Sequence, residues 1–119
     1  MHNFRELKVW RTGIEISKLI FQITRSFPVE ERYSLISQLT RSAISIPSNI
    51  AEGCGRKSDK EPNYFLSISL GSAFELETQM ILANEFGYIE KSKLDNTIIQ
   101  INELQKMIVG LQKSLSIQS

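Results

Sequence analysis

Apolar residues recur at spacings of three and four along almost the whole chain, and this helical period restricts the fold more than any other feature. No stretch alternates at a period of two for long enough to predict a strand. Because the connections are short, the pattern predicts an all-α, antiparallel up-down-up-down four-helix bundle in a single domain, residues 1–119. Its four predicted helices cover residues 7–26, 34–54, 59–86 and 90–115.

A proline falls inside the second predicted helix, in the stretch "SIPSNIAEG" (Ser45–Gly53). Proline lacks a backbone N–H and clashes with the carbonyl four residues earlier, so it usually ends or bends a helix. The apolar repeat nevertheless continues from Leu35 to Cys54 without a change of phase. We therefore predict one helix that is kinked at Pro47, rather than two helices joined by a loop.

Small and capping residues mark the second and third helices. Gly53 and Gly55 are expected to serve as C-terminal capping positions of the second helix. Ser58 and Glu61 have the spacing of a capping box at the start of the third helix. A cluster of small residues around Gly71 predicts that another helix crosses the third helix closely.

The composition is typical of a soluble globular protein, with 41% hydrophobic and 23% charged residues. The chain contains no apolar run long enough to cross a membrane and no N-terminal signal-peptide pattern, so we expect a cytoplasmic protein without a membrane partner. The single cysteine, Cys54, rules out an intrachain disulfide framework. A lone cysteine on an apolar stripe is typical of a core position.

Side chains that would support catalysis or metal binding are scarce. The only histidine, His2, precedes the first predicted helix, so the Glu-x-x-His pairs of a di-iron bundle are missing. Glu52, Glu75 and Glu77 are the only acidic group that we would nominate for a hard cation or for catalysis. Their alternative role is to pair with Arg or Lys of a neighbouring helix. We predict no enzyme activity, no metal and no cofactor.

The net charge of +1 is unevenly distributed. Residues 1–58 contain nine Lys or Arg and five Asp or Glu, a net charge of +4, whereas residues 59–119 contain five and eight, a net charge of −3. This division favours either head-to-tail pairing of copies or a modest basic patch, and ordinary solvated helix faces are the alternative. The candidate phosphate contacts are Arg5, Lys8, Arg11, Arg41, Arg56 and Lys57. For the last three, salt bridges to Glu52, Asp59 or Glu61 are the competing interpretation.

Four segments occur in an order and spacing that resemble a known family: "FRELKVW" (Phe4–Trp10), "SIPSNIAEGCGR" (Ser45–Arg56), "SDKE" (Ser58–Glu61) and "FLSISLGSAFELETQ" (Phe65–Gln79). They resemble the small four-helix-bundle proteins encoded within intervening sequences of bacterial 23S rRNA genes. The accessory variability proteins of diversity-generating retroelements are similar bundles. The signature positions are Trp10, Pro47, Ser48, Asn49, Glu52, Gly53, Gly55, Gly71, Glu75 and Glu77.

The resemblance implies a four-helix protomer that assembles into a ring-shaped homo-oligomer, a pentamer, and that associates with RNA, DNA or a ribonucleoprotein. The retroelement proteins are markedly basic, and this chain departs from them, so charge alone predicts only weak nucleic-acid binding. We predict a non-enzymatic scaffold or accessory protein. The alternative is a protein–protein interaction module that binds no nucleic acid and uses the small residues of the third helix and the spare apolar face of the first.

Overall fold

The computed structural model describes residues 3–56 and 60–118 of the chain. Four long helices form an all-α bundle that measures 46 × 24 × 20 Å, and the described residues contain no strand. The predicted fold class is therefore confirmed. The long helices are α1 (Lys8–Thr24), α2 (Leu35–Cys54), α3 (Lys60–Glu85) and α4 (Lys91–Gln118), and two short 3-10 helices, η1 (Phe4–Glu6) and η2 (Val29–Glu31), precede α1 and α2.

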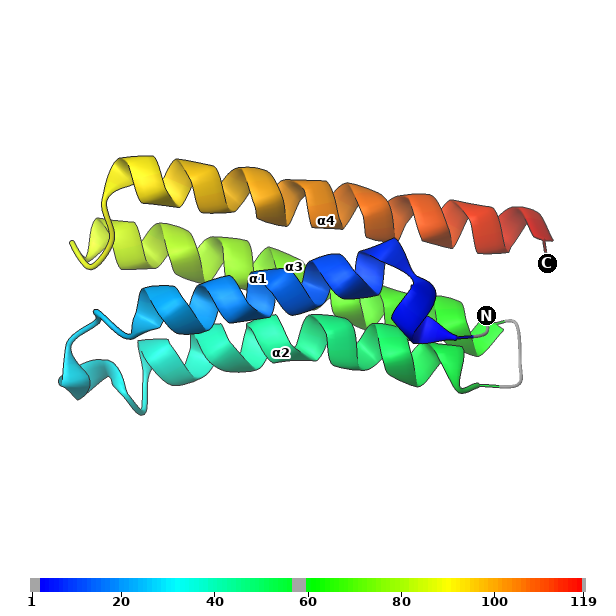
Figure 1. Cartoon of the computed structure of the whole chain (residues 1–119), viewed down its shortest axis with the longest axis horizontal. Helices are drawn as coiled ribbons and strands as arrows, with labels where there is room; N and C mark the ends of the chain where they lie inside the picture. Colours follow the sequence, from blue (N-terminus) through cyan, green and yellow to red (C-terminus); the bar gives the residue numbers. More distant parts are fainter. Residues whose placement is uncertain (1–2, 57–59, 119) are drawn as a thin grey trace.

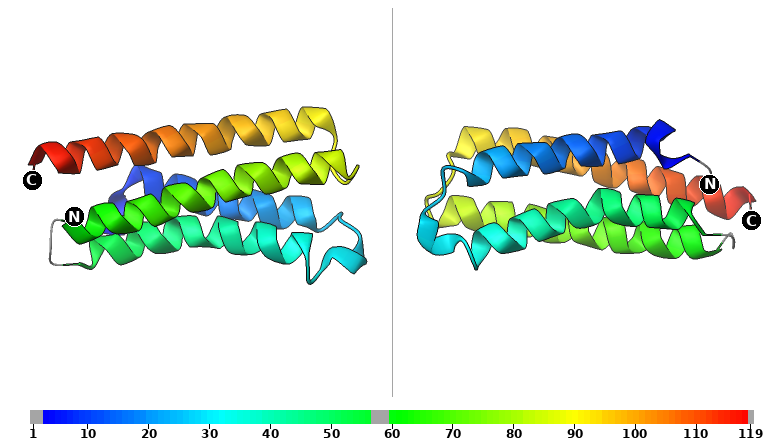
Figure 2. Two further views of the ribbon diagram at one scale, coloured as in Figure 1. Left: turned by 180° about the vertical axis from the view of Figure 1, so that it is seen from behind. Right: turned by 60° about the horizontal axis from the view of Figure 1, so that its bottom comes forward.

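Consecutive helices run in opposite directions, so the connections alternate between the two ends of the bundle (Figure 1). One end, here called the Arg56 end, holds the starts of α1 and α3 and the end of α2. The other, the Tyr88 end, holds the α1–α2 and α3–α4 connections. Both further views show α2 beside α3 (Figure 2), and these two helices make the most extensive contact in the bundle.

The bundle core consists of the apolar stripes that the period of three and four predicts. Its largest fully buried apolar side chains come from all four helices: Ile16, Ile20, Leu39, Ile46, Ile50, Leu66, Leu76, Met80, Ile101, Leu104 and Ile108. Burial of one such side chain stabilises the fold by about 1.5–3 kcal/mol relative to exposure. No helix in the described part of the chain combines the length and apolar character needed to cross a membrane.

The helix α2 continues through Pro47 as one helix, in agreement with the unbroken phase of its apolar repeat. The kink at Pro47 stays a prediction. The expected capping role of Gly53 is wrong, because Gly53 is buried inside α2 and the C-cap is Gly55, with a right-handed φ of −82°. The expected capping box begins at Ser58, which lies outside the described residues.

The helix α3 ends in a Schellman motif at Gly87. Gly87 has a φ of +82°, a conformation that glycine adopts without steric cost. The Gly87 N–H donates to the Asn84 carbonyl at 3.0 Å, and the Tyr88 N–H donates to the Ala83 carbonyl at 2.9 Å. This cap turns the chain sharply into α4.

Candidate nucleic-acid interface

Pro47 lies where α1 crosses α2 closely. A Cβ atom added to Gly13 of α1 would lie 3.3 Å from the Pro47 Cβ, so the glycine allows the proline ring to approach the α1 backbone. Because Pro47 has no N–H, the Ala43 carbonyl lacks its usual partner four residues later. The Ser17 hydroxyl of α1 lies 3.1 Å from this Ala43 oxygen and 2.9 Å from the Gly13 oxygen. A side chain of the neighbouring helix thus replaces the hydrogen bond that proline removes.

The other side of the "SIPSNIAEG" stretch forms a polar seam against α3. The Ser45 and Ser72 hydroxyls are 2.8 Å apart, and the Ser69 hydroxyl donates to the Ile46 carbonyl at 2.9 Å. Asn49 donates to the Ser45 carbonyl at 2.8 Å and to its hydroxyl oxygen at 2.9 Å. Signature residue Asn49 therefore acts within the bundle, and these contacts fix how α2 lies on α3.

The helices α2 and α3 approach each other closely at Gly53. An added Cβ would lie 3.2 Å from the Pro62 carbonyl oxygen and 3.2 Å from the Phe65 Cβ. Gly71, predicted to mark a close crossing, has open space around the same position, and the α2 contacts are made by its neighbours Ser69 and Ser72. The helix α2 therefore does cross α3 closely, but the contact is on the face of α3 that carries Ser69 and Ser72, not on the face of Gly71.

The exposed face of the same α2 segment borders an apolar groove between α1 and α2. Signature residue Trp10 lies on this groove with Phe4, whose ring is 5.2 Å away in an edge-to-face arrangement. From α2 the groove is lined by Pro47 and the exposed Ser48, so this part of the signature reaches the surface.

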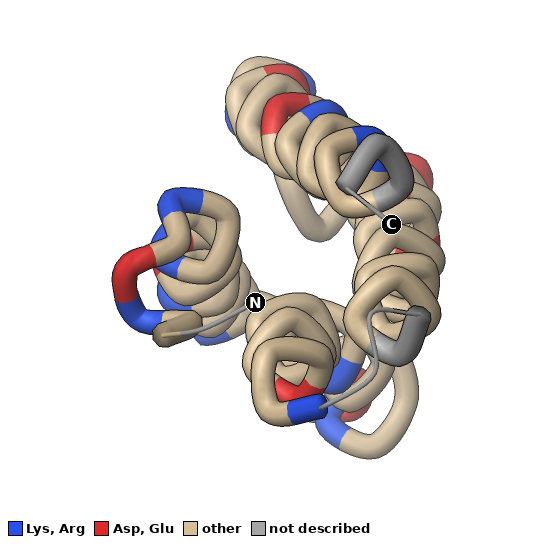
Figure 3. The backbone as a smooth tube through the Cα atoms, turned by 90° about the vertical axis from the view of Figure 1, so that its right-hand side faces the viewer, with Lys and Arg blue, Asp and Glu red and all other residues tan. Residues whose placement is uncertain are grey.

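The predicted basic residues divide between two places. Arg5, Lys8 and Arg11 belong to η1 and the start of α1, and Arg56 follows the end of α2, so all four lie at the Arg56 end. This end of the bundle faces the viewer in Figure 3. Arg41 is exposed but lies fifteen residues before Arg56, about 22 Å away along α2 at 1.5 Å per residue. Lys57 is outside the described residues.

Two of the arginines at the Arg56 end have partners within the protein. The Arg11 guanidinium donates to the Arg5 and Glu6 carbonyls at 3.3 and 3.1 Å, so it holds η1 against α1. Arg56 pairs with Glu52 at 2.5 Å, as its competing interpretation predicts, and its guanidinium also lies 4.8 Å from the Phe65 ring centroid. Within the described residues, Lys8 forms no salt bridge.

The three acidic signature residues do not form one group. Glu52 pairs with Arg56, whereas Glu77 accepts hydrogen bonds from Gln105 at 2.8 Å and Asn102 at 3.1 Å, both on α4. Glu75 is exposed on α3. In the part of the chain that the structure describes, no three His, Cys, Asp or Glu side chains are placed to hold a metal ion. Cys54 is buried, and burial raises the pKa of its thiol.

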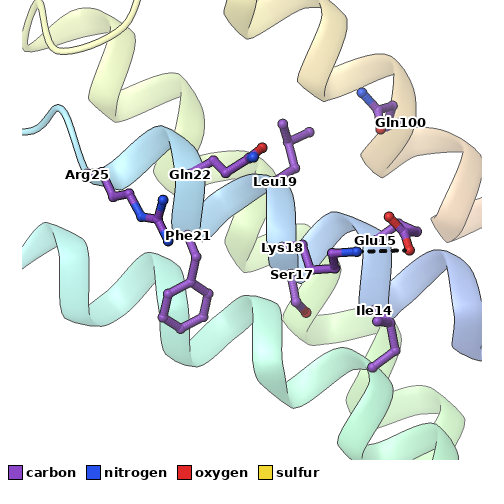
Figure 4. A pocket seen from close by; sticks show the side chains of 9 residues that line it. All are labelled: Ile14, Glu15, Ser17, Lys18, Leu19, Phe21, Gln22, Arg25 and Gln100. Atoms are coloured by element: carbon purple, nitrogen blue, oxygen red, sulfur yellow. Dashed lines mark ion pairs between the residues drawn. The ribbon is translucent and has the colours of Figure 1, made fainter.

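A shallow hollow runs along α1 beside Ile14, Lys18 and Phe21, with Gln100 of α4 at its margin (Figure 4). Glu15 and Lys18 pair with each other at 3.6 Å on its surface. None of the predicted phosphate contacts lines this hollow. Its exposed apolar side chain, Phe21, belongs to the apolar face of α1 that the interaction-module hypothesis uses.

The periodicity did not predict the hydrogen bonds that join the two connections at the Tyr88 end. The Tyr88 hydroxyl donates to Glu31 at 2.9 Å, and Glu31 also accepts from the Ser34 hydroxyl at 2.6 Å and the Leu35 N–H at 3.4 Å. The bonds from Ser34 and Tyr88 lower the Glu31 pKa, and the carboxylate raises the Tyr88 pKa. No local pattern signals a contact between residues this far apart in the sequence.

Comparison with known proteins identifies a family and a solved structure of similar fold. The sequence model of the family described as "23S rRNA-intervening sequence protein" matches residues 5–110. A crystal structure of a protein with unknown function from the S23 ribosomal protein family of Bacteroides thetaiotaomicron has a TM-score of 0.82 and 24% identity, over 88% of this chain and 95% of that chain. At this identity, the likeness shows a shared fold. No curated protein matches, and the similarity to retroelement accessory proteins stays a prediction.

Proposed function

Because this chain belongs to the family of 23S rRNA-intervening sequence proteins, we propose that it is a non-enzymatic cytoplasmic scaffold or accessory protein that associates with nucleic acid at its Arg56 end. The observation that carries the proposal is that Arg5 in η1, Lys8 at the start of α1 and Arg56 after α2 lie at the same end of the bundle. Phosphate groups are the ligands that such a basic cluster favours.

The charge distribution around the Arg56 end supports this assignment. Residues 62–74, which form most of the first half of α3, carry no charged side chain and so add no repulsion toward phosphate. Glu52 remains close, and its pairing with Arg56 offsets part of the positive charge. The expected association is therefore modest in strength and sensitive to salt, because few phosphates are neutralised.

Filter binding to a structured RNA with single-stranded loops, at low and high salt, tests the proposal. A triple variant with Arg5→Gln, Lys8→Gln and Arg56→Gln is compared with a control that neutralises Lys18, Arg25 and Arg32. Both variants lose three positive charges, but the control residues lie outside the Arg56 end. We expect only the first variant to bind weakly, with a salt slope smaller by about 0.7 for each lost single-strand contact. No binding by the unmodified protein at low salt, or equal losses in both variants, would contradict the proposal.

We also propose that the protein is a homo-oligomer, as the family resemblance implies, with a pentameric ring as the expected state. Exposed apolar side chains on α3 support self-association, including Phe74, 51% exposed, and Ile81, 42% exposed. The excess of positive charge on residues 1–58 and of negative charge on residues 59–119 favours a head-to-tail contact. Light scattering on the purified protein should give five times the chain mass, and a stable monomer would refute the assembly.

The second candidate function is a protein-interaction module without nucleic-acid binding. Two apolar surfaces favour it: the hollow along α1 beside Phe21, and the exposed apolar side chains of α3. The buried small residues Ser69 and Ser72 do not belong to this surface, because they bond to α2. An assembled protein that binds no RNA at low salt would favour this function over the first.

A further inference from the structure

Two clusters that each pair an arginine with aromatic rings lie at the Arg56 end. In the first, the Arg56 guanidinium carbon lies 4.8 Å from the Phe65 ring centroid, and the Tyr64 ring meets Phe65 edge-to-face at 5.2 Å. In the second, the Arg5 guanidinium carbon lies 5.6 Å from the Phe4 ring centroid, and Phe4 meets Trp10 at 5.2 Å. Each cluster thus combines a cationic side chain with two aromatic rings.

The two clusters flank the exposed face of the last turns of α2. Trp10 lies on the groove between α1 and α2, whereas Arg56 and Phe65 lie where α2 meets α3. Between them α2 exposes the small residues Ser48 and Gly55 and the longer side chain of Glu52. A helix is about 10 Å wide, a distance that a few unstacked nucleotides cover.

The aromatic rings are both accessible and held in position. Tyr64 is 63% exposed, and Phe4, Trp10 and Phe65 are half-buried, so packing fixes one side of each ring. The exposed ring of Tyr64 is therefore available for stacking on a flat ligand. Bases of a duplex are already stacked and paired, whereas unpaired bases have free faces.

We propose that this surface binds single-stranded nucleic acid, with unpaired bases stacking on Tyr64 and on the Phe4–Trp10 pair and with Arg5 and Arg56 contacting the backbone. The inference rests on the proposed nucleic-acid association and adds the class of ligand. It also explains how a chain of net charge +1 binds nucleic acid, because stacking on aromatic side chains contributes affinity independently of the protein's charge.

Substitution of Glu52 tests whether this surface binds nucleic acid. Its carboxylate lies on the α2 face between the clusters and pairs with Arg56, so it both repels phosphate and occupies the arginine. Glu52→Gln removes the repulsion and frees the guanidinium. This variant should bind a single-stranded oligonucleotide more tightly than the unmodified protein, by a fewfold at low salt.

Fluorescence titration with oligouridine, and with a duplex RNA of equal length, tests the proposal. Trp10 is the only tryptophan of the chain, so its quenching reports directly on the second cluster. We expect oligouridine to quench Trp10 and to bind more tightly than the duplex. Tyr64→Ala should weaken oligouridine binding about tenfold or more, and Tyr64→Phe should retain it because the ring is kept.

Tyr33→Ala is the matched control, because Tyr33 is 89% exposed and lies in the α1–α2 connection at the opposite end. It should bind as the unmodified protein does. Equal binding of duplex and oligouridine, or equal affinity of the Tyr64→Ala and Tyr33→Ala proteins, would overturn the stacking site while leaving charge-based association intact. Absence of any nucleic-acid binding at low salt would overturn both proposals.

Discussion

Pro47 is accommodated inside α2 because α1 supplies what the proline removes. The Pro47 ring can approach α1 because Gly13 has no side chain. The Ser17 hydroxyl donates to the Ala43 carbonyl, which the proline leaves without its usual donor. Ser17 lies 26 positions from Ala43 in the sequence, and no local pattern relates the two residues. The sequence therefore predicts the continuous helix but not the compensation. The phase of the apolar repeat can be read from α2 alone, whereas the hydrogen-bond donor, the Ser17 hydroxyl, comes from α1.

The Ser17 hydroxyl should matter only while residue 47 is proline. Ser17→Ala leaves the buried Ala43 carbonyl without a donor, so we expect the free energy of unfolding to fall by about 1–2 kcal/mol. In a Pro47→Ala background, the restored N–H bonds to Ala43, and the same substitution should cost much less. Urea unfolding of the four proteins at one concentration measures this coupling. Equal costs in both backgrounds would show that Ser17 does not compensate for the proline.

At the scale of the elements, Gly53 lies at a contact between two helices, whereas Gly71 lies on an open helix face. Gly53 meets Pro62 backbone atoms that have no freedom to turn aside, whereas the space around Gly71 is open. Both are signature positions, and the sequence assigns them roles that the structure changes. Whether a glycine caps a helix or allows a close crossing depends on which helix lies opposite it. An amphipathic pattern predicts which face of a helix is buried, but not which helix packs against that face.

Alanine at these two glycines should have opposite effects. Gly71→Ala adds helix propensity without a clash and should raise the free energy of unfolding by about 0.5–1 kcal/mol. Gly53→Ala gains the same propensity but forces α2 away from α3, and it should lower the free energy by about 1 kcal/mol or more. Thermal and urea unfolding, monitored by circular dichroism, measure the change in the free energy of unfolding for each variant. A stabilised Gly53→Ala protein would refute the close contact.

The candidate interface is partly visible in the sequence for a geometric reason. In an antiparallel pair, the start of α1 must lie beside the end of α2, so Arg5, Lys8 and Arg56 are expected at one end. The same reasoning, with 1.5 Å per residue, separates Arg41 from them. The ring contacts of Arg56 with Phe65 and the hydrogen bonds of Arg11 to carbonyls were not predictable, because they depend on side-chain directions.

For the whole molecule, the Glu31–Tyr88 hydrogen bond ties the first helical pair to the second at the end opposite Arg56. It depends on an ionised carboxylate and a protonated phenol. The Glu31 pKa is lowered from 4.5, so its contribution to stability is present above that value and is lost as the pH falls through the folded-state pKa. The Tyr88 pKa is raised from 10.0, so the contribution of the phenol is present below that value and is lost as the pH rises through its folded-state pKa.

Substitutions in this network should flatten the acid limb of the stability profile. Because Ser34 lowers the Glu31 pKa most and Tyr88 is second, Ser34→Ala should reduce the acid-induced loss of stability more than Tyr88→Phe does. Urea midpoints measured across the acid range test the order of the three proteins. Tyr33→Phe, an exposed tyrosine outside the network, serves as the control and should follow the unmodified protein. Superimposable profiles for all variants would contradict the role of Glu31.

The hydroxyl that reaches from α1 to the α2 backbone also bears on how the protein opens. If α1 detached, the Ala43 carbonyl in the middle of α2 would lose the Ser17 hydroxyl and have no hydrogen-bond donor. We therefore expect the two helices to unfold together rather than one after the other. Native-state hydrogen exchange would then report them as one cooperative unit. Because α1 and α2 are consecutive in the chain, only the short connection through η2 has to close when this unit forms.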